Sequence, residues 1–118
     1  ILNQGSVVKF QFLDREIDAN VVTKQDIRIA IMHTTTPAYV DLSPNSSFGY
    51  VRFFTQDQKH FYLETLDSSK VLSLKNRQLQ FSEISQAEEE QYFEKVAKRK
   101  EKFKKIHKNT QIHQNLEN

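Results

Sequence analysis

The chain has no cysteine and no tryptophan, and it has only two glycines and two prolines among 118 residues. Without cysteine there is no disulfide framework and no Cys-based zinc site. So few glycines argue against a glycine loop that cradles phosphate. No apolar run reaches membrane-spanning length, and nothing resembles a signal peptide. The length suffices for one domain with a real core and is too short for two.

Positive charge is concentrated at the C-terminal end. Residues 1–90 carry nine basic and twelve acidic side chains, whereas residues 91–118 carry eight basic and three acidic ones. The overall net charge of +2 therefore hides a body of −3 and a terminal segment of +5. In helical register, that segment also has an apolar stripe that includes Tyr92, Val96 and Phe103. A basic amphipathic helix on a mildly acidic body indicates a polyanionic partner such as a phosphate backbone.

Hydrophobic periodicity predicts an alternation of strands and helices. The first strand is indicated by Val8, Phe10 and Phe12, which alternate with polar residues. The predicted elements are strand 7–12, helix 23–32, strand 38–42, strand 48–54, helix 56–66, a short strand 71–74, a turn at Lys75-Asn76, strand 78–84, and a helix 86–108. The last helix opens with Ser85 and Glu88, which form a capping-box pattern.

This order is the βαββαβ pattern of an α+β, ferredoxin-like fold with a four-stranded antiparallel sheet and an appended C-terminal helix. We expect a single domain over residues 1–108 and a disordered tail over 109–118, where apolar residues are scarce. Because the chain starts at Ile1 and not at Met, we also expect it to be a fragment of a longer protein.

The expected faces follow from the same patterns. In the second helix we expect Phe61, Tyr62 and Leu66 to face the core. In the second main strand, alternation turns Val40 inward, and Tyr39 and Asp41 outward to solvent.

The third main strand carries Phe48-Gly49-Tyr50-Val51-Arg52-Phe53, the last six positions of the signature by which RNA-recognition domains are identified. The basic residue and the glycine at the start of that signature are missing. The partner signature on the first strand would place an aromatic residue near Lys9, and none is there. The usual platform for stacking two bases is therefore incomplete.

The second strand offers another reader of bases. Pairing of the second and third strands would place Tyr39 and Asp41 beside Arg52. A carboxylate can accept from guanine N1 and N2, an arginine can donate to O6 and N7, and a tyrosine can stack. The three residues are chemically suited to read guanine. The alternative is an exposed ion pair between Asp41 and Arg52 that contributes little stability.

The terminal helix supplies further candidate contacts. Phe103 stands among basic residues, two to three turns beyond the apolar cluster at Tyr92 and Val96. It could stack on an unpaired base while its neighbours contact phosphates; the alternative is local packing. The candidate phosphate contacts are Arg99, Lys100, Lys102, Lys104, Lys105 and His107.

Nothing in the sequence indicates catalysis. The histidines have no metal-ligand spacing, and no nucleophile motif such as G-x-S-x-G is present. We expect neither an enzyme nor a bound metal or cofactor. The competing class is a protein-interaction module, with the terminal helix covering the sheet, a basic face that binds an acidic polypeptide, and only nonspecific RNA binding.

Tyr39-x-Asp41, Arg52 and a long basic helix after the last strand together resemble the extended RNA-recognition motif of the La-related protein 7 group, which includes the La-family protein of ciliate telomerase. The resemblance covers about Val7 to Lys108. It implies a helix that lies across the sheet, guanine bound between sheet and helix, and Phe103, or alternatively Phe93, inserted at unpaired nucleotides.

The resemblance also implies the partner and the setting. The domain would bind a structured noncoding RNA, such as telomerase RNA or a similar polymerase III transcript, and help to fold it and to assemble its ribonucleoprotein. It would act as a monomer in the nucleus and away from membranes. A contact with the telomerase catalytic subunit is left open.

Overall fold

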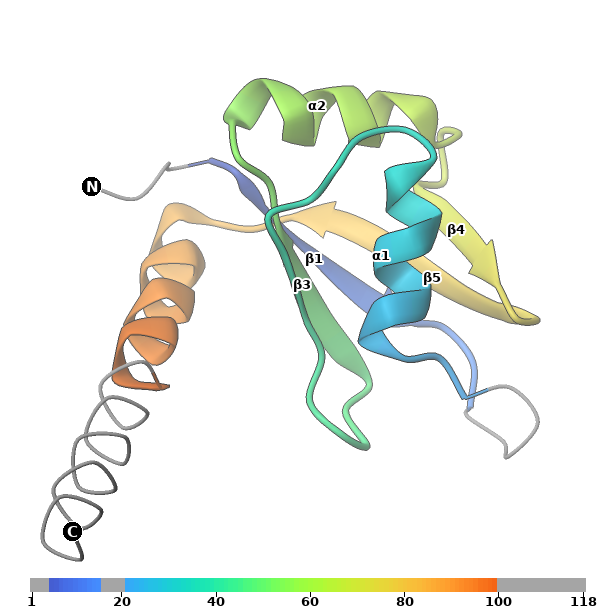
Figure 1. Cartoon of the computed structure of the whole chain (residues 1–118), viewed down its shortest axis with the longest axis horizontal. Helices are drawn as coiled ribbons and strands as arrows, with labels where there is room; N and C mark the ends of the chain where they lie inside the picture. Colours follow the sequence, from blue (N-terminus) through green and yellow to red (C-terminus); the bar gives the residue numbers. More distant parts are fainter. Residues whose placement is uncertain (1–4, 16–20, 100–118) are drawn as a thin grey trace, which may run out of the picture. The chain divides into compact units, whose positions relative to one another are not determined.

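The computed structural model describes residues 5–15 and 21–99 (Figure 1). These residues belong to two compact units that divide after Ser85. No helix within the described ranges is long and apolar enough to cross a membrane.

The first unit is an antiparallel sheet with two helices. Its strands are β1 (Val7–Phe12), β2 (Tyr39–Asp41), β3 (Phe48–Arg52), β4 (Val71–Leu74) and β5 (Arg77–Glu83), and its helices are α1 (Lys24–Met32) and α2 (Gln56–Thr65). The spatial order is β2-β3-β1-β5-β4, so β1 lies at the centre of the sheet. The predicted α+β fold is confirmed. The short segment Val71–Leu74 pairs with β5 and adds a fifth strand at the edge.

Local signals explain where the elements begin and turn. Thr23 and Asp26 form the capping box of α1, in which each side chain accepts a hydrogen bond from the other residue's backbone N–H. The bond from the Thr23 backbone and the nearby Lys75 side chain hold the pKa of Asp26 below its usual value. Lys75 and Asn76 both have positive φ, as a two-residue turn between β4 and β5 requires.

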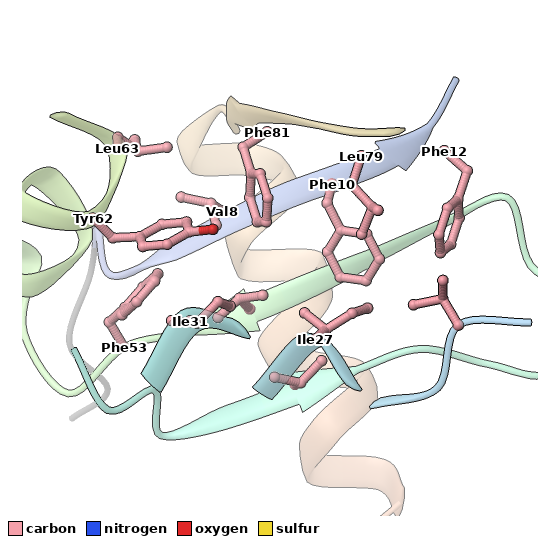
Figure 2. Packing of buried hydrophobic residues seen from close by; sticks show 13 residues of the cluster. Val8, Phe10, Phe12, Ile27, Ile31, Phe53, Tyr62, Leu63, Leu79 and Phe81 are labelled. Carbon is pink, nitrogen blue, oxygen red and sulfur yellow. The ribbon is translucent and has the colours of Figure 1, made fainter. Parts of the chain in front are cut away.

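The core lies between one face of the sheet and the two helices (Figure 2). From the sheet it takes Val8, Phe10, Val51, Leu79 and Phe81, and from the helices Ile27, Ile31, Tyr62 and Leu63. The Tyr62 ring packs edge to face on Phe81, with 5.3 Å between ring centroids. Burial raises the pKa of the Tyr62 hydroxyl.

One predicted core residue is wrong. Phe61 is 54% exposed, because the buried stripe of α2 runs through Lys59, Tyr62 and Leu63. These positions are spaced at three and four residues, the helical repeat that faces one side. Phe61 falls outside this stripe.

A buried arginine stabilises the start of β5. Arg77 is 5% exposed, and its guanidinium lies 3.9 Å from the centroid of the Phe12 ring. Its Nε donates to a carboxylate oxygen of Asp14 at 3.2 Å. The other carboxylate oxygen of Asp14 accepts from the backbone N–H of Gln78. The Asp14 side chain therefore holds the first two residues of β5.

The second unit is described only in part. Residues 86–99 are helical and are called the terminal helix below. It begins directly after Ser85, where the capping pattern predicted its start. The rings of Tyr92 and Phe93 meet edge to face at 5.5 Å. The predicted end of this helix at residue 108 and the predicted disordered tail 109–118 lie outside the described residues.

An ion pair between α2 and β5 gives a testable pH dependence. The Nζ of Lys59 lies 2.7 Å from Oε1 of Glu83, and this contact lowers the pKa of Glu83 below 4.5. A lowered carboxyl pKa contributes stability that is present above the ordinary value and lost as the pH falls through the lowered one. We expect Glu83→Gln to lower the free energy of unfolding by about 1 kcal/mol at pH 7. The difference should shrink as the pH falls below 4.5.

Urea unfolding of the unchanged protein and of Glu83→Gln across this pH range measures the difference in their free energies of unfolding. Glu64→Gln, which makes the same change at an exposed glutamate of α2, serves as the control. A deficit in Glu83→Gln that stays constant down to low pH would show that the ion pair is not its source.

Candidate nucleic-acid interface

The sheet face opposite α1 and α2 is assembled from alternate strand residues. Directly opposed residues of antiparallel strands point to the same face. Tyr39 is opposite Arg52, Asp41 and Lys9 are both opposite Tyr50, and Gln11 is opposite Phe48. We call this surface the aromatic face, and its residues on β1, β2 and β3 are Val7, Lys9, Gln11, Tyr39, Asp41, Phe48, Tyr50 and Arg52.

Two rings of β3 stand at the middle of this face. Phe48 and Tyr50 meet edge to face with 6.0 Å between their centroids. Phe48 is 40% exposed and Tyr50 is half-buried. Flat rings on the outer surface of a sheet are a common site for stacking unpaired bases. The two rings of the signature on the third strand therefore lie on the outer face of the sheet.

Lys9 takes the place where the first strand lacks an aromatic residue. It is opposite Tyr50 on one side and Ser82 on the other. Its Nζ lies 4.8 Å from the centroid of the Phe48 ring. The sequence showed the missing ring, but it gave no role to the lysine that stands there.

Tyr39 lies near two cations at the β2 edge of the sheet. Its ring is 5.2 Å from the guanidinium carbon of Arg52 and 5.7 Å from the Nζ of Lys24. The predicted closeness of Tyr39 and Arg52 is confirmed by their register. The Nε of Arg52 is buried and has no hydrogen-bond partner in the part of the chain that the structure describes. Lys24 was not predicted, because its distance from Tyr39 depends on how α1 packs beside β2.

Asp41 differs from expectation. The register places it on the aromatic face, but its relative exposure is only 7%, so the prediction that it is open to solvent is wrong. It is directly opposite Tyr50, and opposed side chains on one face lie about 5 Å apart. A base could reach Asp41 only after neighbouring side chains move.

The candidate contacts of the terminal segment are only partly described. Arg99 is exposed at the end of the described part of the terminal helix. The others lie outside the described residues, so their contacts with RNA remain a prediction: Lys100, Lys102, Phe103, Lys104, Lys105 and His107. Within residues 5–15 and 21–99 there is no cluster of three or more His, Asp or Glu side chains that could hold a metal ion.

A family model described as an RNA binding motif matches residues 5–112, nearly the whole chain. The chain belongs to this RNA-binding family. The match includes all five strands and most of the basic terminal segment. RNA is accordingly the class of partner that the family indicates. No curated protein matches the chain.

Proposed function

We propose that this RNA binding motif binds a structured RNA at unpaired nucleotides, with a base stacked on the ring of Tyr50 beside Phe48. The observation that carries the proposal is this ring pair on the outer face of the sheet, with Lys9 4.8 Å from the Phe48 ring centroid. Rings supply stacking to any base, and cations hold the backbone on either side. A duplex offers no exposed base, so unpaired nucleotides are needed.

The finer part of the proposal concerns guanine. Tyr39 and Arg52 already lie together at one edge of the aromatic face. A guanine stacked near them would present its O6 and N7 to the arginine and its N1 and N2 to Asp41. Because Asp41 is buried, its part requires side chains to rearrange on binding, which is common at interfaces.

The biological setting is proposed from the resemblance to the La-related protein 7 group. A polymerase III transcript, telomerase RNA among them, would be the natural RNA, and the role would be to fold it and to assemble its ribonucleoprotein in the nucleus. The basic residues from Arg99 to His107 would contact phosphates, and Phe103 would stack on an unpaired nucleotide. Support for this comes from the Tyr39-x-Asp41 pattern, Arg52 and the basic terminal segment.

A titration with a bulged RNA hairpin and its bulge-deleted twin tests the function. We expect the protein to prefer the bulged RNA, and Tyr50→Ala to weaken that binding by about 1–3 kcal/mol, the contribution of one base stacked on an aromatic ring. Phe48→Ala should act in the same direction. A guanine-to-adenine change in the bulge tests the finer proposal, because it exchanges the groups that Arg52 and Asp41 would recognise.

Phe61→Ala is the matched control. It removes a ring that is 54% exposed and lies on α2, outside the aromatic face, so RNA binding should not change. Equal affinity for the two hairpins would instead identify a protein-interaction module that binds RNA nonspecifically. Equal effects of the control and test variants would show that the aromatic face is not the site.

A further inference from the structure

We propose that Lys9 is a phosphate-binding residue at the centre of the aromatic face. With Lys9 there, the sheet would hold one stacked base and the phosphate beside it, and not two stacked bases. The inference rests on the proposed function, because it requires RNA on this face.

Lys9 lies at the centre of the sheet. β1 is the central strand, and Lys9 is flanked there by Tyr50 on β3 and Ser82 on β5. Neighbouring strands lie about 5 Å apart, so Lys9 stands within one strand spacing of the Tyr50 ring. A cation at the centre of a sheet surface faces any chain that crosses that surface, whereas a cation at the rim contacts only its ends.

Lys9 also contacts the ring of Phe48. The ammonium of Lys9 lies over the ring at 4.8 Å from its centroid. A base cannot stack on a ring face while an ammonium covers it. Of the two rings of β3, Tyr50 therefore remains the better platform, and Phe48 positions the lysine.

The ammonium group of Lys9 can bind a phosphate in addition to its contact with Phe48. The Lys9 side chain is half-buried beside the exposed Phe48 ring, and its ammonium has three donors on a flexible stem. One of these donors can bind a phosphate while the ammonium keeps its place on the aromatic face. The charged strand residues of this face on β1, β2 and β3 are Lys9, Arg52 and the buried Asp41, so cations outnumber acids there. An anionic group close to Tyr50 would thus meet a favourable field.

The test compares Lys9→Met with the unchanged protein on two bulged hairpins. One hairpin has natural phosphates, and the other has a neutral methylphosphonate next to the bulged base. We expect the unchanged protein to bind the neutral hairpin about fivefold more weakly, because a phosphate contact is lost. Lys9→Met should bind both hairpins equally, and its salt dependence should be shallower by about one phosphate contact. Lys9→Arg should restore both effects.

Lys75→Met is the matched control. It removes the same charge from the turn between β4 and β5, where Lys75 forms an ion pair with Asp26. If Lys9→Met loses the difference between the two hairpins only because the protein carries one positive charge fewer, Lys75→Met will lose that difference too. We expect instead that Lys75→Met still distinguishes the two hairpins by about fivefold.

A second comparison tests the limit of one base. Lys9→Phe restores a ring at this place, so it should gain affinity for a two-base bulge over a one-base bulge, whereas the unchanged protein should gain little. A gain of the same size in the unchanged protein, or an equal methylphosphonate effect in Lys9→Met, would overturn the proposal. Failure of Tyr50→Ala to weaken binding would be a different result, because it would remove the RNA from this face altogether.

Discussion

Replacing Gly49 with alanine is expected to lower the free energy of unfolding by about 3 kcal/mol, the upper range for overpacking a core. An added Cβ would lie 2.4 Å from the carbonyl oxygen of Asp41 and 2.4 Å from Cζ of the Phe10 ring. The ring could shift, but the carbonyl belongs to the backbone of β2. Strand β2 would have to move away from β3, and Tyr39 would move with it.

Urea unfolding measures the stability, and the bulged-hairpin titration measures the effect on the site. We expect Gly49→Ala to lose RNA binding even under conditions where it remains folded, because the register between β2 and β3 sets the positions of Tyr39 and Arg52. Ser73→Ala, a change to alanine at an exposed position of the edge strand β4, is the control. An unchanged unfolding midpoint in Gly49→Ala would show that the strands accommodate the methyl group.

Replacing Phe10 with alanine should destabilise the domain still more, by about 3–5 kcal/mol. Phe10 is fully buried on the central strand, and its ring centroid lies 5.9 Å from those of both Phe12 and Phe81. Its removal leaves a cavity between sheet and helices that the surrounding side chains can only partly fill. Urea unfolding measures the loss, and Phe61→Ala, at an exposed ring of α2, should change the free energy of unfolding by less than about 0.5 kcal/mol.

The two changes should not be additive. Phe10 and Gly49 are directly opposed in the sheet, so the glycine leaves space for the ring. In the double variant the methyl group no longer meets the ring, although it still meets the Asp41 carbonyl. The combined loss should therefore be smaller than the sum of the single losses. Additive losses would mean that the backbone contact alone determines the effect of Gly49→Ala.

Much of the fold could be predicted because its signals are local. The Thr23 cap fixes the start of α1, and the turn at Lys75-Asn76 needs only two residues with positive φ. The alternation that indicated β1 sets Val8, Phe10 and Phe12 on one face of the strand, and all three are buried. The burial of Asp41 could not be predicted in this way, because a strand pattern gives the face of a side chain but not what covers that face.

The candidate site could likewise be predicted only in part. Tyr39 and Arg52 were expected side by side, since the strand order of this fold pairs β2 with β3. At Lys9 the sequence indicates only that an aromatic residue is missing. Its contact with Phe48 joins diagonal neighbours on two paired strands, which the alternation along one strand does not predict. The contact between Lys24 and Tyr39 joins a helix to a sheet edge, and no repeat in the sequence indicates it.

The strands at the two margins of the sheet are short, with three residues in β2 and four in β4. Few unpaired backbone N–H and C=O groups are thus available to a strand from another molecule, and brevity at an edge is a known protection against aggregation. One copy of the domain therefore offers another copy little backbone for strand pairing at either edge.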